Sequence, residues 1–204
     1  MTSKILLSIA AAAAALMPLA ASGQVAPEKR PAIASSAPAY KYEAYAGFAY
    51  TSLNQVNQSR YGLMGGDLAL TRDFGRHFGI TANGAYFRVP SSSSNPGNPG
   101  SPTVISVAAG PEFRSTLYGN VDGFVHVLLG GEHTGGEGMT PTVSFSAGFG
   151  GGLLYNLSQR LALRVSGDRM SDSFTLTTTN NNADGYSPHT HYNARATVGV
   201  VYRF

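Results

Sequence analysis

From Tyr40 to the end of the chain, apolar and polar residues alternate with a period of two. In the clearest run one face carries Val143, Phe145, Ala147, Phe149, Gly151, Leu153 and Tyr155, and serine or glycine fills most of the other. The runs at 40–51 and 190–204 alternate in the same way. This period is typical of β-strands whose two faces meet different surroundings.

Continued along the chain, the alternation predicts eight strands. Their ranges are 40–51, 61–72, 77–89, 103–114, 121–132, 142–156, 160–170 and 190–204. The links at 72–76, 115–120 and 157–160 are short, whereas those at 52–60, 90–102, 133–141 and 171–189 are longer and polar. Short turns at one rim and longer loops at the other are typical of outer-membrane barrels. The predicted fold class is all-β, an eight-stranded antiparallel up-and-down transmembrane β-barrel.

The length of the apolar faces favours a membrane location. In the first, sixth and last strands they run past ten residues, about what a tilted strand needs to cross the hydrocarbon layer. A closed barrel can cross because every backbone group pairs with a neighbouring strand. A secreted soluble barrel with a ligand cavity, like a lipocalin, is the alternative. It would turn the apolar residues inward, and alternation alone does not distinguish the two.

The first 23 residues have the three parts of a secretory signal peptide. Lys4 supplies a positive charge, 5–19 is apolar apart from Ser8 and Pro18, and small residues follow. A membrane-anchoring helix is less favoured, because Pro18 interrupts a run that falls short of about 20 apolar residues.

We therefore expect three segments. Residues 1–23 are the signal peptide, with the mature start near Gln24. Residues 24–39, rich in Pro, Ala and Ser, form a flexible periplasmic leader. Residues 40–204 form the barrel. The predicted localisation is the bacterial cell outer membrane, reached by export through the inner membrane.

Composition agrees with this interpretation. The chain has 25 Gly, 11 Tyr and 10 Phe, and only 12% of its residues are charged, about half the usual share in soluble domains. The absence of cysteine excludes a lipid-anchored N-terminus and disulfides. A net charge of +3 is too small and dispersed to indicate nucleic-acid binding.

Several segments resemble the small outer-membrane barrels of the OmpA-transmembrane and OmpX type, over about Tyr40–Phe204. The segments are Ala109-Gly110-Pro111-Glu112-Phe113, Phe124-Val125-His126-Val127, Gly150-Gly151-Gly152 followed by Leu161-Ala162-Leu163-Arg164 and Asp168, and the terminal Tyr202-Arg203-Phe204. The resemblance implies that Val200, Tyr202 and Phe204 are read by the barrel assembly machinery. No peptidoglycan-binding domain follows, so we expect no role in tethering the membrane to the cell wall.

If the apolar faces meet lipid, the polar faces fill the lumen. The predicted lumen network is Glu43, Asp67, Glu112, Arg114, Asp122, His126, Arg164, Asp168 and Arg195. An eight-stranded barrel is just wide enough for side chains to fill it. We therefore expect a plug of ion pairs and hydrogen bonds rather than the alternative, a narrow pore for small solutes.

Two arginines, Arg88 and Arg169, fall at alternating positions that are predicted to face lipid. They lie near the loop ends of their strands, where a charge costs little free energy. They are candidate contacts for lipopolysaccharide phosphates in the outer leaflet, although snorkelling into the headgroups would also explain them. Aromatic residues are expected to form interfacial girdles. They are Tyr42, Tyr50, Phe78, Tyr86, Phe113, Tyr155, Tyr202 and Phe204.

No residue cluster indicates catalysis, a metal site or a cofactor. His189 and His191 with Asp184, and Glu132 with His133, have spacings compatible with a metal, but histidines in polar loops are a weak signal. A lipid-modifying barrel enzyme would need a serine beside a base at the lipid surface, and His126 has no serine neighbour. His77 suggests no function.

The predicted function is therefore a structural or surface-interaction barrel that is not an enzyme. We expect a monomer that contacts outer-membrane lipids and lipopolysaccharide, and no nucleic acid. The long polar loop 171–189 suits adhesion or shielding. Pro111 lacks the N–H that a paired strand uses, which predicts either a bulge there or a strand edge nearby. Gly123 and Gly130-Gly131 predict similar bends.

Overall fold

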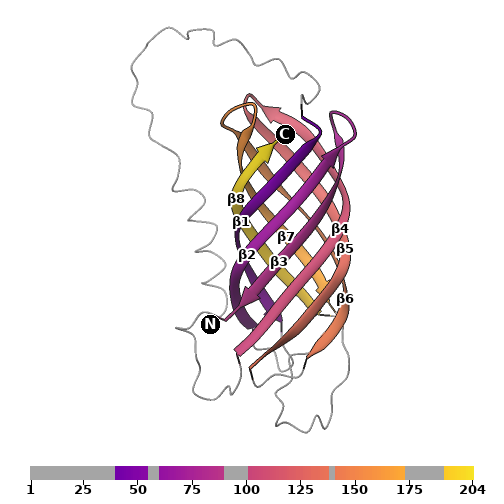
Figure 1. Ribbon diagram of the computed structural model, residues 1–204, viewed down its shortest axis with the longest axis vertical. Coiled ribbons are helices and arrows are strands. Elements are labelled where there is room, and N and C mark those ends of the chain that lie inside the picture. The colour runs from indigo at the N-terminus through magenta and orange to yellow at the C-terminus, as the bar shows by residue number, and fades with distance from the viewer. Residues whose placement is uncertain (1–39, 55–59, 90–100, 138–140, 173–190) are drawn as a thin grey trace, which may run out of the picture. The chain divides into compact units, whose positions relative to one another are not determined.

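The computed structural model describes residues 40–54, 60–89, 101–137, 141–172 and 191–204. They form eight strands: β1 (Tyr42–Asn54), β2 (Arg60–Asp73), β3 (Phe78–Arg88), β4 (Ser101–Tyr118), β5 (Val121–Glu137), β6 (Thr142–Asn156), β7 (Leu161–Asp172) and β8 (His191–Arg203). Each pairs antiparallel with the next in chain order, and β8 returns to β1 (Figure 1). The prediction of an eight-stranded up-and-down barrel is confirmed. The predicted signal peptide and leader lie outside the described residues.

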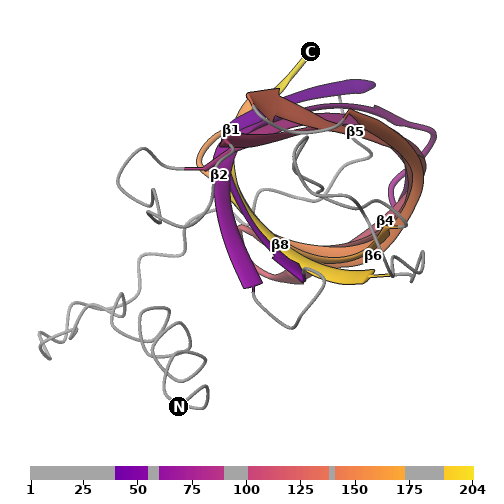
Figure 2. The same ribbon diagram turned by 90° about the horizontal axis from the view of Figure 1, so that it is seen from below.

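The barrel closes where the two ends of the strand series meet, and seen end-on the strands form a ring (Figure 2). The Tyr42 N–H donates to the Phe204 carbonyl at 3.1 Å, and the Phe204 N–H donates back to Tyr42 at 2.9 Å. Because the strand number is even, β8 runs antiparallel to β1 and can pair with it as the other neighbouring strands do. A closed barrel leaves no unpaired edge strand.

Two strands, β4 and β5, are clearly longer than the alternation predicts. β4 ends at Tyr118, and Gly119, with φ of +52°, begins a tight turn to β5. Residues 133–137, predicted as loop, belong to β5, and His133 and Thr134 pair on both sides, with β4 and β6. Backbone pairing continues here through polar and glycine residues, which carry no apolar alternation.

The predicted bulge at Pro111 is wrong. Pro111 pairs with Ile80 of β3, and on the β5 side Ala109 pairs with Leu129 and Glu112 with His126, so neither strand gains a residue. The register shifts instead between Thr116 and Tyr118. The predicted bends at glycine involve no bulge, because Gly123, Gly130 and Gly131 pair with β4 and β6 without a break in register.

Side chains alternate between the outer wall and the interior. Outward-facing Leu68 and Val107 are each 64% exposed and Phe145 is 65% exposed. Two apolar clusters lie inside. One, on β1–β4, is Ala49, Leu53, Leu63, Ala85, Phe87 and Val104; the other is Tyr45, Phe124, Leu154, Ala162 and Val201. Among the described residues, no helix has the length and apolarity to cross a membrane.

Candidate functional site

All nine residues of the predicted lumen network lie on strand faces that point into the barrel. Seven are buried: Glu43, Asp67, Glu112, His126, Arg164, Asp168 and Arg195. Arg114 and Asp122 are partly exposed, near the end of the barrel that carries the short turns. The interior therefore holds a concentration of charge that requires compensation.

The network begins at the short-turn end with Glu43. Its carboxylate accepts two hydrogen bonds of 2.7 Å from the Arg114 guanidinium and one of 2.6 Å from Arg203 Nε. A guanidinium fork matches a carboxylate in this way because both groups are planar. Arg203 was not predicted in the network, although its parity along β8 points inward.

Arg114 connects Glu43 to the residues in the middle of the barrel. Its Nη2 also donates to Glu112 Oε1 at 2.7 Å, and Arg164 Nη2 donates to Glu112 Oε2 at 3.0 Å. The Arg164 guanidinium carbon lies 3.9 Å from the centre of the Phe124 ring, a cation–π contact. Glu112, 2% exposed, is thus held between two arginines.

His126 and Asp168 continue the network. His126 Nε2 lies 2.8 Å from Asp168 Oδ1, and Arg195 Nε donates to Asp168 Oδ2 at 2.8 Å. Because the carboxylate only accepts, the His126 proton on that side sits on Nε2. Its other nitrogen, Nδ1, lies 3.4 Å from Arg164 Nη2. Among the described residues its partners are carboxylates and a guanidinium, an arrangement that fixes the ring rather than activating a nucleophile.

Asn83 ends the network. Arg195 Nη1 donates to Asn83 Oδ1 at 3.1 Å, and Asn83 Nδ2 donates to Asp67 Oδ1. A cavity of about 10 Å³, lined in part by Asp67, Asn83, His126 and Arg195, lies beside it. That is room for about one water molecule. Oppositely charged and hydrogen-bonded side chains therefore fill the lumen from Arg203 to Asp67.

Gly150 shows why the interior needs glycine. It pairs with Asp168, and a Cβ built on it would lie 2.1 Å from Asp168 Oδ1. Gly167, on the outer face of the neighbouring strand, has nothing within 4 Å of the same position. The absence of a side chain at Gly150 leaves room for the carboxylate that joins His126 to Arg195.

A closed eight-stranded barrel with an apolar outer wall and a charged, filled interior defines the architecture. The fold is that of the small outer-membrane barrels. No family model and no curated protein matches the sequence. Similarity to solved structures is low in sequence and extensive in fold. Neisserial surface protein A aligns with a TM-score of 0.62 and 11% identity, over 83% of this chain and 99% of its own.

Two further small outer-membrane barrels align over most of the chain. OprG from Pseudomonas aeruginosa gives a TM-score of 0.55 at 12% identity, over 83% of this chain and 98% of its own. Ail, the attachment invasion locus protein of Yersinia pestis, gives 0.52 at 17% identity, over 81% and 99%. The predicted resemblance to this class is confirmed at the level of fold.

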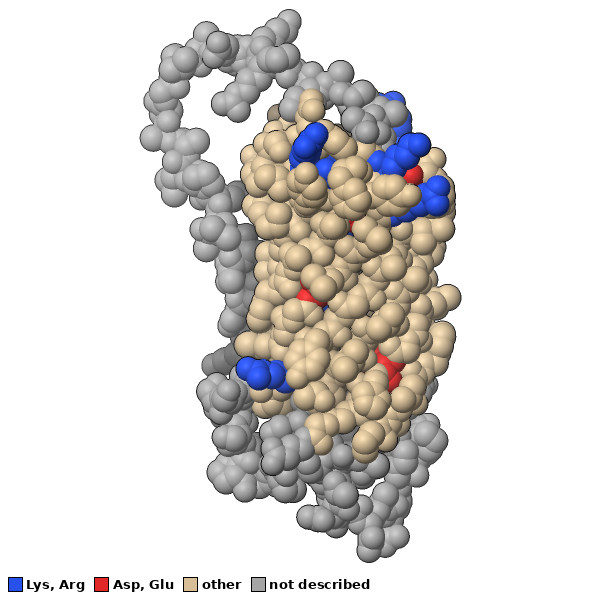
Figure 3. All heavy atoms as spheres, viewed as in Figure 1, with Lys and Arg blue, Asp and Glu red and all other residues tan. Residues whose placement is uncertain are grey.

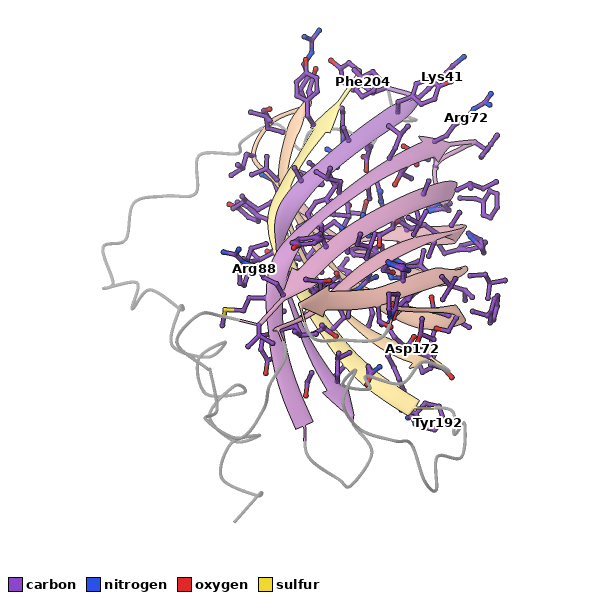
Figure 4. The ribbon with its side chains drawn as sticks, turned by 60° about the horizontal axis from the view of Figure 1, so that its bottom comes forward. Lys41, Arg72, Arg88, Asp172, Tyr192 and Phe204 are labelled. Carbon is purple, nitrogen blue, oxygen red and sulfur yellow. The ribbon has the colours of Figure 1, made fainter. Side chains whose placement is uncertain are left out.

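Asp122 was predicted in the lumen network, but its described hydrogen bonds do not connect it to the other members. Near the rim of the barrel it accepts hydrogen bonds from Thr116 Oγ1 at 2.8 Å and Asn156 Nδ2 at 2.7 Å. The predicted lipopolysaccharide contacts also lie apart from the network. Arg88 points outward from β3 (Figure 4), and Arg169 is exposed on β7. The Arg169 guanidinium carbon lies 4.4 Å from the centre of the Tyr192 ring.

The terminal aromatic residues also lie on the outer wall. The Tyr42 and Phe204 rings stack at 5.8 Å between centroids, and Tyr202 and Phe204 stack at 6.2 Å. Val200 shares this exposed face of β8. The proposed assembly signal is therefore on the surface of the barrel, beside the start of β1.

The predicted histidine pairs do not form a metal cluster among the described residues. Glu132 is buried and points inward, whereas His133 next to it is exposed on the outer wall. Asp184 and His189 lie outside the described residues. Three further residues that are buried on inward faces were not predicted: Asn83, Asp172 and Asn193. Inward parity was the available signal for Asn83, but Asp172 fell in a predicted loop.

Proposed function

We propose that this chain is an integral outer-membrane β-barrel with a structural and surface-interaction role and a plugged lumen. The observation that carries the proposal is the inverted distribution of polarity. Among the described residues, 32 large apolar or aromatic side chains are exposed, whereas the buried set includes nineteen polar or charged residues. Soluble monomers rarely expose apolar patches beyond a few hundred Å².

The outer wall is laid out as a bilayer requires. Figure 3 shows a largely uncharged wall, with most of the visible Lys and Arg at the end where the C-terminus lies and one such group near the opposite end. Aromatic residues, among them Tyr42, Phe78 and Phe113, cluster at the same end. Charged ends around an apolar belt match the headgroup and hydrocarbon layers. A soluble ligand-binding barrel would have the opposite polarity.

The filled interior favours a structural role over a pore. Side chains of this size occlude an eight-stranded lumen, and Glu43 and Glu112 each hold an arginine from a non-adjacent strand across it. Surface interaction would fall to the longer loops, most of which lie outside the described residues. Recognition of Val200, Tyr202 and Phe204 by the assembly machinery during biogenesis is part of the same proposal.

Spin labels on the outer wall test the membrane location. The chain lacks cysteine, so Phe145→Cys, Phe149→Cys and Val198→Cys each accept one label. In lipid vesicles, we expect all three labels to relax faster with oxygen, which partitions into lipid, than with a water-soluble nickel complex. A label at Ser158→Cys, in the turn between β6 and β7, is the water-exposed control. Three strand labels as accessible to nickel as Ser158 would refute the proposal.

Lipopolysaccharide is the proposed surface lipid partner. Arg88 and Arg169 present guanidinium groups outside the barrel, and guanidinium pairs well with phosphate. Replacing both with Gln should lower the lipopolysaccharide that co-purifies with the barrel by at least half. The matched control replaces Arg72 and Arg160, exposed at the short-turn end, with Gln. Unchanged lipopolysaccharide in the Arg88/Arg169 variant would remove this partner from the proposal.

A further inference from the structure

Two buried carboxylates in the loop-side half of the barrel form no ion pair with a described Lys, Arg or His side chain. Glu132 of β5 is 6% exposed and Asp172 of β7 is 1% exposed. Figure 4 shows Asp172 at the end of the barrel opposite Lys41 and Arg72. No described Lys, Arg or His side chain lies within salt-bridge distance of either, whereas the buried carboxylates Glu43, Glu112 and Asp168 each hold an arginine. A buried charge without a partner is costly.

The arginine whose charge acts on both carboxylates is already engaged. Arg195 lies on β8 and donates to Asp168 and Asn83. The described hydrogen bond to Asp172 comes from Asn193 Nδ2, a neutral amide, and it reaches only Oδ2. Glu132 and Asp172 are close enough for their charges to repel one another. The local charge therefore requires a cation that the described side chains do not supply.

Buried serine oxygens surround the same two carboxylates. Ser106 and Ser144 pair with Glu132 from its two sides, and Ser146 pairs with Asp172. Residues directly opposite one another place their Cβ atoms about 4.5–5.5 Å apart. Among the described residues, the three serine Oγ atoms and Asp172 Oδ1 are buried and form no hydrogen bond of standard geometry. They are four of seven such side-chain atoms in the described part of the chain, and all four are oxygens. Ser106 Oγ lies close enough to the Glu132 carboxylate to interact with it.

We propose that Glu132, Asp172 and the serines paired with them bind one calcium ion inside the barrel. Calcium takes six to eight oxygen ligands from carboxylates, neutral oxygens and water in flexible geometry, whereas Mg²⁺ requires a near-ideal octahedron. Glu132 and Asp172 supply two negative charges that one divalent ion balances, and the serine hydroxyls supply neutral oxygens. No three acidic, histidine or cysteine side chains gather in the described residues. The site is therefore mixed and of modest affinity, ~10⁻⁴–10⁻³ M, as in extracellular calcium modules.

Calcium titration of the whole folded barrel tests the site. The protein is refolded in a zwitterionic detergent, stripped with a chelator and titrated with CaCl₂ by calorimetry. We expect one ion per barrel and a rise in the unfolding temperature with calcium. Glu132→Gln/Asp172→Asn should abolish both effects, and Ser146→Ala, which keeps the charges, should weaken binding severalfold.

Asp122→Asn is the matched control, because Asp122 lies at the opposite end of the lumen and has its own hydrogen-bond donors. It should bind calcium as the parent does. No calcium binding by the parent would overturn the proposal and indicate that the carboxylates are protonated. Equal binding by Glu132→Gln/Asp172→Asn would also overturn it. The site goes beyond the proposed membrane function, since a barrel in water would bind the ion equally well, so the two proposals fail separately.

Discussion

Glu112→Gln is expected to lower the free energy of unfolding by about 3–5 kcal/mol, the usual cost of leaving a buried charge without its partner. Glu112 receives one hydrogen bond from Arg114 and one from Arg164. Arg114 keeps Glu43 after the substitution, but Arg164 loses its described salt bridge. Glutamine fills the same volume as glutamate, so the loss of stability comes from the removed charge and not from a cavity.

Urea unfolding of the barrel in lipid vesicles would measure this change. Asp122→Asn is the control, because Asp122 lies near the rim and forms hydrogen bonds but no described ion pair; we expect a loss below about 1.5 kcal/mol. Adding Arg164→Met to Glu112→Gln should recover at least half of the lost stability, since the stranded charge is then removed. Equal losses in Glu112→Gln and Asp122→Asn would show that the network does not hold the interior together.

Much of the fold was predictable because one physical rule governs every strand. A residue's parity decides whether it meets the wall or the interior, so the faces of the runs at 40–51, 142–156 and 190–204 could be assigned from the sequence. The inward position of Glu112 and Asp168 follows from the same parity. Their partners do not, because pairing depends on how distant strands align across the closed barrel. Glu43 meets Arg114 and Arg203, 71 and 160 residues away.

The unpaired carboxylates escaped prediction for a related reason. Asp172 followed the last apolar position of its predicted strand, and Glu132 stood at the end of another. Where polar residues face both sides, alternation disappears although backbone pairing continues, as at His133 and Thr134. Sequence patterning thus locates a barrel's apolar belt better than its polar rims, and the rim is where this barrel places its unbalanced charge.

Val198→Arg, on the apolar belt, is expected to cost about 2–4 kcal/mol in a bilayer, because charge at the midplane must leave water. Val198 is half-exposed near the middle of β8. Leu117→Arg is the matched control. Leu117 is more exposed than Val198 and lies beside the short turn after β4, where the same charge should cost about 0–1 kcal/mol.

The difference in cost between Val198→Arg and Leu117→Arg reports whether lipid or water contacts the outer wall, not side-chain packing, since both side chains face outward. Reversible unfolding in thin-bilayer vesicles would give the two free energies. A soluble barrel exposes both positions to water, so both arginines would then be tolerated. A small and equal cost at Val198 and Leu117 would contradict membrane insertion, whereas a depth-dependent cost requires hydrocarbon against the middle of β8.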